Sequence, residues 1–371
     1  MRKLRLAAGI VLASLVAAPL LLPAGQRKKR EEITQTLEIP KDPPLAVTAE
    51  TARLAFHVSQ LSAKGLLSQQ LRDALKDVER QARGGTIVKL RAFVAGSGDM
   101  RRVQSIVSET FTDKRKPIPA LSVVQVGGLP LTGAQVVLEA VSVARRAQNP
   151  HGIAFFAGQQ VSAGGALEPV AGLAKKAIAN LQTAMQASGA EPGDVLQVTC
   201  LLTTLSDVND VRGQIYTAFP RAAANHVQVQ RAAYRSIAEC EAVARLSQPP
   251  KGGLVMLNPA GLPHSPHSSQ VALVGAPKVI LSGTQLGFGS REDDIRLAFQ
   301  RLEKAIEPLG GTLRRVAMAH LYPLSDGMSG AIRKVRGEFC DMANPPASTM
   351  LTFEGLPSLD ATFAIEVVAV P

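Results

Sequence analysis

One order of predicted strands and helices occurs three times along the chain, with about 100 residues between copies. The middle copy, Val198–Leu246, shows it most fully: a strand at Val198–Leu202, a helix that begins after Asp207 and ends near Phe219, and two more strands. The segments IVKLRAFVAGSGDMRRVQSIVSETF and RVAMAHLYPLSDGMSGAIRKVRGEF begin the other two copies. Solenoid repeats are about 20–50 residues long. Each copy is therefore predicted to be a small domain, and the chain a fusion of three.

The predicted repeats span residues 46–147, 148–250 and 251–371. With 46% hydrophobic and 19% charged residues, the chain has the composition of a globular protein, which excludes a disordered one. Because it contains no Trp, aliphatic side chains must build most of its cores. Pro249–Pro266 holds the motifs PPKGG and NPAGLPHSP and is expected to be a long connection between the second and third repeats.

Apolar periodicity predicts the elements inside each repeat. Alternating residues predict strands, and spacings of three and four residues predict helices. The predicted strands and opening hairpins include Arg53–Ser62, Gly152–Val161, Lys278–Gly289 and Leu313–Leu321, and the predicted helices include Leu67–Val78, Met100–Phe111, Leu173–Ala187 and Ile295–Ile306.

The first 32 residues have the pattern of an export signal. MRKLR precedes the uncharged apolar run Ala7–Leu22, which is shorter than the ~20 residues that a membrane-spanning helix needs. A cleaved signal peptide and a membrane anchor through residues 7–22 both remain open. We expect the protein to be periplasmic or anchored to the membrane, with residues 33–45 as a proline-containing linker.

The net charge of +11 raises the question of nucleic-acid binding. Seven of these charges flank the N-terminal apolar run: Arg2, Lys3, Arg5, Arg27, Lys28, Lys29 and Arg30. The rest of the chain is close to neutral for its size, so nucleic acid is not an expected partner.

The chain has three cysteines, which are too few for a disulfide framework. Cys200 and Cys240 each fall inside an apolar strand pattern, whereas Cys340 follows a predicted helix. We expect Cys200 and Cys240 to act as small buried apolar side chains rather than as redox or catalytic groups.

The middle repeat contains four motifs, Phe156-Ala-Gly-Gln159, Thr203-Thr-Leu-Ser-Asp207, Tyr216–Phe219 and Glu241-Ala-Val-Ala244. These motifs resemble those of the RidA family of reactive intermediate deaminases. The outer repeats are more divergent, and together the three cover nearly all of the chain after Ala46. The resemblance implies three tandem chorismate-mutase-like α+β modules. They would form a monomeric pseudo-trimer with a central β-barrel and a ligand cleft between each pair of repeats.

The RidA resemblance also implies a reaction, the hydrolysis of enamines and imines to ammonia and a carbonyl compound. This chemistry needs a carboxylate that donates and accepts protons, and a cation that holds the substrate carboxylate. Glu139, Glu241 and Glu366, each in the last strand of its repeat, match the family's carboxylate. Strand alternation could equally place them in solvent. No cofactor or metal is expected.

The family's Arg is missing from all three repeats. Its place in the P-A-R-S-x-V motif is taken by Leu121, Ala224 and Ser348. We therefore expect an altered substrate, with Ser348 as a candidate substrate-binding residue. Arg212 could supply a cation from the second helix of the middle repeat, although a solvated helix residue is the alternative.

His226 stands two residues after Ala224, so strand geometry places both side chains on one face. The equivalent residues of the other repeats, Val123 and Met350, are apolar. We therefore expect His226 to mark the cleft that binds a polar ligand, with a packed strand histidine as the alternative. His264 and His267 have metal-like spacing, but no acidic or thiol ligand lies near them in the sequence, so loop histidines are expected.

Three functions remain open at this level. The first is deaminase-like hydrolysis with an altered substrate, and the second is a catalytically silent pseudo-trimer that binds a small ligand or a protein. The third is an endoribonuclease, an activity that the resemblance also carries, but the dispersed charge and the lack of a His/Lys cluster disfavour it.

Overall fold

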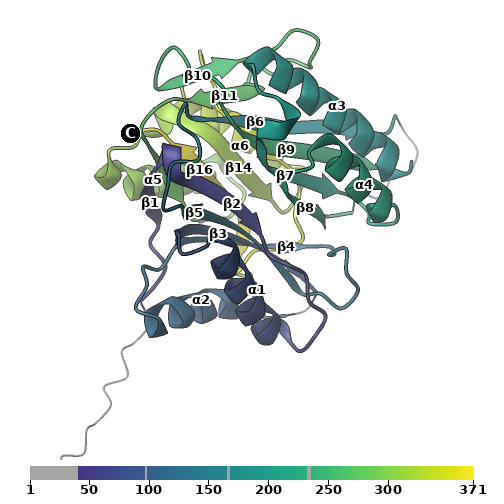
Figure 1. Ribbon diagram of the computed structural model, residues 1–371, viewed down its shortest axis with the longest axis vertical. Helices are drawn as coiled ribbons and strands as arrows, with labels where there is room; N and C mark the ends of the chain where they lie inside the picture. The colour runs from purple at the N-terminus through teal and green to yellow at the C-terminus, as the bar shows by residue number, and fades with distance from the viewer. Residues whose placement is uncertain (1–40, 97, 165–167, 232–234) are drawn as a thin grey trace, which may run out of the picture. The chain divides into compact units, whose positions relative to one another are not determined.

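The computed structural model describes residues 41–371 except 97, 165–167 and 232–234. The described chain is a mixed α+β protein in which each predicted repeat supplies two helices (Figure 1). The predicted segment 1–32 and most of the linker 33–45 lie outside the described residues. Within those residues no helix has the length and apolar character needed to span a bilayer.

The first sheet has four strands in the order β2-β5-β3-β4, with β3 and β4 parallel. Helices α1 and α2 cover one face, where residues such as Leu71 and Val107 pack on Leu90 and Leu138. The bounds are β2 Leu54–Val58, α1 Leu67–Gln81, β3 Thr86–Ala95, α2 Arg101–Asp113, β4 Ala120–Val126 and β5 Val136–Val143.

The second sheet has six strands in the order β10-β11-β6-β9-β7-β8. The bounds are β6 Ile153–Ser162, α3 Val170–Ser188, β7 Val195–Leu202, α4 Val208–Ala218, β8 Ala223–Gln228, β9 Ile237–Arg245, β10 Leu254–Leu257 and β11 Val271–Val274. The expectation that Pro249–Pro266 is only a connection is wrong, because it contains β10. The four apolar residues of β10 pair with β11. The sequence did not predict this strand because the surrounding Pro and Gly residues are typical of a loop.

The third sheet runs β1-β12-β16-β14-β15, with β13 also beside β16. The bounds are β1 Ala46–Glu50, β12 Lys278–Ser282, β13 Gln285–Phe288, α5 Glu292–Ile306, β14 Val316–Pro323, α6 Met328–Phe339, β15 Ala347–Met350 and β16 Ala361–Ala369. Strand β1 falls in the predicted first repeat, yet it pairs along its whole length with β12. The predicted hairpin Lys278–Gly289 is wrong, because β12 and β13 both pair with β16 instead of with each other.

The three sheets pack together through the faces that their helices leave uncovered. One apolar cluster contains Phe93 and Val137 of the first sheet, Leu201 of the second, and Tyr322 and Ala364 of the third. The predicted closed β-barrel is not found, since the described strands form three separate hydrogen-bonded sheets. Side-chain packing and isolated backbone bridges, such as Gly128 with Gln228 and Gln125 with Gly355, join them in place of a continuous strand ladder.

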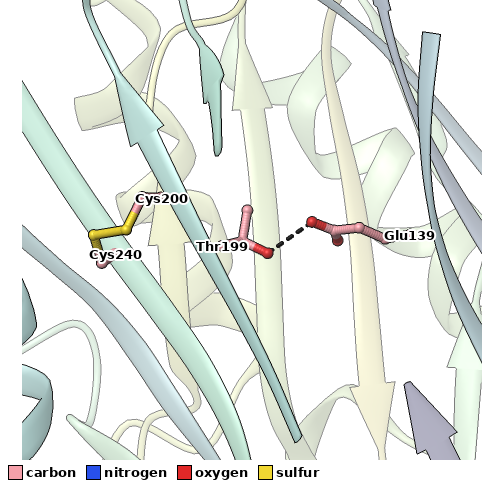
Figure 2. Close-up of a disulfide and its surroundings, with 4 residues drawn as sticks. All are labelled: Glu139, Thr199, Cys200 and Cys240. Atoms are coloured by element: carbon pink, nitrogen blue, oxygen red, sulfur yellow. Dashed lines mark hydrogen bonds between the residues drawn. A yellow bond between two sulfur atoms is a disulfide. The ribbon is translucent and has the colours of Figure 1, made fainter. Parts of the chain in front are cut away.

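Cys200 and Cys240 form a disulfide between the neighbouring antiparallel strands β7 and β9, with their Cα atoms 4.2 Å apart (Figure 2). Both are fully buried, as expected, but the sequence-based interpretation of them as merely small apolar side chains is wrong. Their pairing depends on the strand register, which places Cys200 directly opposite Cys240. Cys340 is buried and free.

Candidate functional site

The three predicted glutamates occupy the same place in the three sheets. Strand pairing sets Arg91 opposite Glu139, Thr199 opposite Glu241, and His320 opposite Glu366. All three glutamates are buried on the sheet faces turned away from the helices, because the alternate residues, such as Leu138 and Ala140, pack in the helix-side core. We call these glutamates, with Arg91, Lys89 and His320, the carboxylate ring.

Arg91 connects the members of the ring. Its Nε donates to Glu139 at 2.7 Å and its Nη2 to Glu241 at 2.8 Å, and its Nη1 lies 3.7 Å from Glu366. Lys89 Nζ donates to Glu366 at 2.5 Å. One guanidinium therefore neutralises charge from all three sheets, which its planar fork of donors makes possible.

Each glutamate is also held by a polar side chain of another sheet. Glu139 accepts from Thr199 and Asn225, both at 2.7 Å, and Figure 2 shows the first of these bonds. Glu241 accepts in the same way from Thr349, and Glu366 from Ser122. The ring is thus a set of bonds between sheets, and it fixes how the three pack.

His320 completes the ring between the second and third sheets. Its Nε2 lies 3.0 Å from Glu241, and its Nδ1 lies 3.4 Å from Glu366. Burial alone would raise the pKa of Glu241, but His320 and Arg91 outweigh burial and hold the pKa well below its ordinary value. Burial is likewise outweighed at Glu366, where Lys89, His320 and Arg91 lower the pKa to about 2.

These ion pairs keep Glu241 and Glu366 ionised near neutral pH. A residue that must donate a proton needs a pKa closer to the working pH, so the pairs favour a role in holding the sheets together. A catalytic role for Glu139, Glu241 or Glu366 stays a prediction.

Two residues further along the strands lies a second set of equivalent positions. There Phe93 faces Val137, Leu201 faces Glu239, and Tyr322 faces Ala364. Only the second sheet carries a carboxylate at this level. Sequence reasoning missed Glu239, although the run Ala-Glu-Cys-Glu-Ala contained the signal: on a strand, Glu239 and Glu241 must share a face.

Glu239 has the environment of a proton donor and acceptor. Burial raises its pKa to about 8, helped by the negative charge of Glu241, while the Met350 N–H and Arg333 act in the opposite direction. The carboxylate lies against Gly158, where any Cβ would overlap it. Glycine at 158 therefore makes the room that Glu239 occupies.

A cleft of 490 Å³ opens between the second and third sheets. Glu239 is buried behind its wall rather than part of it, next to the lining residues Gln160 and Ile237. Gln160, the strand partner of Glu239, is part of its wall, as are Ile237 and Met350. Arg235 and Arg333 bring positive charge, and the Arg235 Nε has no hydrogen-bond partner within the described chain. We call this the Glu239 cleft; its hydroxyl and amide groups come from Gln160, Thr203, Gln230, Ser329 and Thr352.

The other predicted site residues lie elsewhere. Asn225 and Thr349 point into the ring, so their neighbours His226 and Ser348 point toward the opposite sheet face. His226 is buried there, and burial together with the charge of Arg212 lowers its pKa to about 4. Arg212 is exposed on α4. None of the three lines the Glu239 cleft, and a ligand-binding role for them stays a prediction.

Among the described residues, no group of three or more His, Cys, Asp or Glu side chains is placed to bind a metal ion. The wall of the Glu239 cleft carries three guanidinium groups, from Arg231, Arg235 and Arg333, the carboxyl group of Asp326, and several neutral donors and acceptors. Behind this wall lies the buried carboxyl group of Glu239, whose pKa is raised to about 8.

No family model and no curated protein matches this chain. Solved structures do match part of it at low identity. A protein of unknown function of the conserved Rid family, YyfB from Yersinia pestis, is 16% identical and covers 32% of this chain and 100% of its own, with a TM-score of 0.30. A YjgF-family member from Neisseria meningitidis is 13% identical over 32% of this chain and 93% of its own, with a TM-score of 0.24. RidA from the Antarctic bacterium Psychrobacter sp. PAMC 21119 is 18% identical over 25% of this chain and 80% of its own, with a TM-score of 0.22.

Proposed function

We propose that this protein hydrolyses imines or enamines in the Glu239 cleft, with Glu239 as the acid and base. The observation that carries the proposal is the pKa of about 8 of a buried carboxyl group beside a polar cleft. A group whose pKa lies near the working pH is present in both protonation states, so it can donate a proton and then recover one.

The proposed reaction balances with water as the only co-reactant. Protonated Glu239 gives its proton to the imine nitrogen, and the resulting carboxylate takes a proton from the water that adds to the carbon. The same proton then passes to the nitrogen of the carbinolamine, which leaves as ammonia. As the carbonyl group forms, the hydroxyl proton of the carbinolamine returns to the Glu239 carboxylate, which restores the starting state. An enamine enters the sequence after protonation at carbon.

Arg235 and Arg333 are proposed to hold an anionic part of the substrate. They would replace the Arg that is absent at Leu121, Ala224 and Ser348, and both line the same cleft. Because they approach from α6 and from the segment before β9, the anion would lie differently from one bound by an arginine on the edge strand. This is our explanation for an altered substrate.

The three-module architecture is part of the proposal. Modules at 46–147, 148–250 and 251–371 are supported by the equivalent placement of Glu139, Glu241 and Glu366 and by bonds that run from each sheet to another. A pseudo-trimer of this kind is complete within one chain. We therefore expect a monomer, with a mass near 39.1 kDa before any processing.

Export is proposed on two grounds. Residues 1–32 have the pattern of a signal, and the Cys200–Cys240 disulfide suits an oxidising compartment outside the cytosol. Fusing residues 1–32 to a reporter that works only after export should give an active reporter. An inactive reporter retained in the cytosol would exclude export by this segment.

The activity is tested by ammonia release from a panel of imines generated in situ from different amines. Glu239→Gln should lower the rate by about 100-fold or more, the range for loss of a general acid–base group. Thr204→Val, at a half-buried loop position that is not part of the cleft wall, is the matched control and should retain the rate. Equal rates for the wild type and Glu239→Gln on every reactive imine would overturn the assignment, and no release from any imine would favour a catalytically silent pseudo-trimer.

A further inference from the structure

A second hollow lies on the other side of the carboxylate ring from Glu239. Two residues before Arg91, Thr199 and His320, the strands carry Lys89, Gln197 and Met318, which face Val141, Val243 and Val368. All six line a cavity of 80 Å³, and all three sheets contribute to it. We call it the central cavity. A water molecule needs roughly 10–15 Å³ measured in this way, so the space suits several waters or one small molecule.

The walls of the central cavity are mainly apolar. Phe56, Phe155 and Leu281 join the three valines around it. Phe56, Val141, Val243 and Val368 are only half-buried, which gives the cavity contact with solvent. An apolar hollow with a few convergent polar groups is the usual form of a small-molecule site.

The charged groups at the floor leave no cation available for an anion. Lys89 Nζ already donates to Ser122, to the Ser282 carbonyl and to Glu366. Arg91 is bonded to Glu139 and Glu241. His320 likewise lies against Glu241 and Glu366. The three carboxylates therefore already occupy Lys89, Arg91 and His320, and a ligand carboxylate or phosphate would have to compete with them for these partners.

Gln197 is the polar group of this cavity that remains open to a ligand. It is only 7% exposed and lines the cavity, yet its amide makes no hydrogen bond to any described residue. Because the Gln197 amide faces the cavity and is not committed to a partner in the described chain, a ligand hydroxyl or ammonium group can bond to it. Gln197 therefore marks where the polar end of a ligand would lie.

We propose that the central cavity is a second binding site, for a small aliphatic molecule with one polar end that is neutral or positively charged. The aliphatic part would contact Phe56, Val243 and Val368, and the polar end would bond to Gln197 beside the carboxylate ring. The site is separate from the Glu239 cleft and does not depend on the proposed hydrolase activity.

The test uses calorimetric titration of the full chain with butan-1-amine and butan-1-ol, with butanoate as the anionic control. The amine and the alcohol should bind saturably, and butanoate at least about tenfold more weakly, which corresponds to 1.4 kcal/mol. Val243→Phe fills the cavity and should abolish binding, whereas Val255→Phe, on half-buried β10 outside the cavity, should not change it.

Two further variants keep the test decisive. Gln197→Leu preserves the bulk of the side chain and should weaken the alcohol by about tenfold if the amide is its partner. Glu239→Gln should bind both probes as the wild type does, which separates this site from the proposed active site. Absence of saturable binding by the wild type, unchanged binding by Val243→Phe, or equal affinity for butanoate would each overturn the proposal.

Discussion

Glu239 and Glu241 are two residues apart on β9 and share a face of the second sheet, yet their surroundings shift their pKa values in opposite directions. The pKa of Glu239 is raised to about 8, and that of Glu241 is held well below its ordinary value. Both carboxyl groups are fully buried, so burial alone does not explain the difference. What differs is the partner: Arg91 and His320 reach Glu241, whereas the level of Glu239 carries Val137 and Ala364 in the other sheets.

The comparison distinguishes Glu241, a carboxylate that stabilises the packing of the sheets, from Glu239, a carboxyl group that can exchange a proton near neutral pH. A cation in contact with a buried carboxylate more than offsets the effect of desolvation on its pKa. The carboxylate then stays ionised as part of a buried ion pair between sheets. A buried carboxylate without such a contact holds its proton into the neutral range. Pairs of acids whose environments separate their pKa values in this way are typical of active sites.

The largest expected effect on stability comes from removing Arg91, the cation that contacts Glu241 but not Glu239. Arg91→Met should lower the free energy of unfolding by about 3–5 kcal/mol, because Glu139 and Glu241 lose a buried charge partner. Urea denaturation measures this. Arg72→Met removes an exposed ion pair with Glu109 and should cost at most about 1 kcal/mol. Similar losses in the free energy of unfolding of the two variants would show that the carboxylate ring does not stabilise the packing of the three sheets.

The pH dependence of the free energy of unfolding should reflect both the raised pKa of Glu239 and the lowered pKa of Glu366. Because the folded pKa of Glu239 is raised from 4.5 to about 8, its contribution is complete below pH 4.5 and is lost as the pH rises toward 8. Glu366 has the opposite sign: its contribution is present above pH 4.5 and is lost as the pH falls toward 2. Glu239→Gln should therefore reduce the loss of unfolding free energy between pH 4.5 and 8 by on the order of 2–4 kcal/mol. The loss at acidic pH should be unchanged. Denaturation at a series of pH values checks this, and an unchanged alkaline side would contradict the raised pKa.

Gly158→Ala should displace the Glu239 carboxylate by steric overlap, without changing any charged group. The new methyl group would occupy the position of the Glu239 carboxylate, so we expect a loss of about 1–3 kcal/mol in stability and a large fall in any imine hydrolysis. Gly172→Ala is the matched control, because a methyl group there meets no neighbour. Full activity in Gly158→Ala would place the reaction away from Glu239.

The smallest expected effect concerns His226. Because its side chain points away from the carboxylate ring and does not line the Glu239 cleft, His226→Ala should leave the hydrolysis rate and the affinity for substrate unchanged. Steady-state kinetics on the best imine provides the measurement. A marked rise in KM would return His226 to the binding role that its sequence position suggested.

The sequence alone determined the local elements and one shared feature of the site. Helix periodicity around Leu71 and strand alternation around Glu139 depend on residues close together in the chain, so a single sequence suffices to predict them. The glutamates of the three final strands were identified through the resemblance to the RidA family, and strand alternation alone left open whether they face solvent. Bounds such as those of α3 differ from the prediction by a few residues, since terminal turns depend on local hydrogen bonds.

Only the tertiary structure decided which carboxylates are paired. The bond from Arg91 to Glu241 joins residues 150 positions apart, and the bond from Lys89 to Glu366 joins residues 277 apart. Pairing of β1 with β12 is equally remote in sequence. No local pattern encodes such contacts, because they depend on how separate sheets pack. The same packing brings no cation of the described residues into contact with Glu239, which makes this glutamate, rather than Glu241, the candidate for acid–base chemistry.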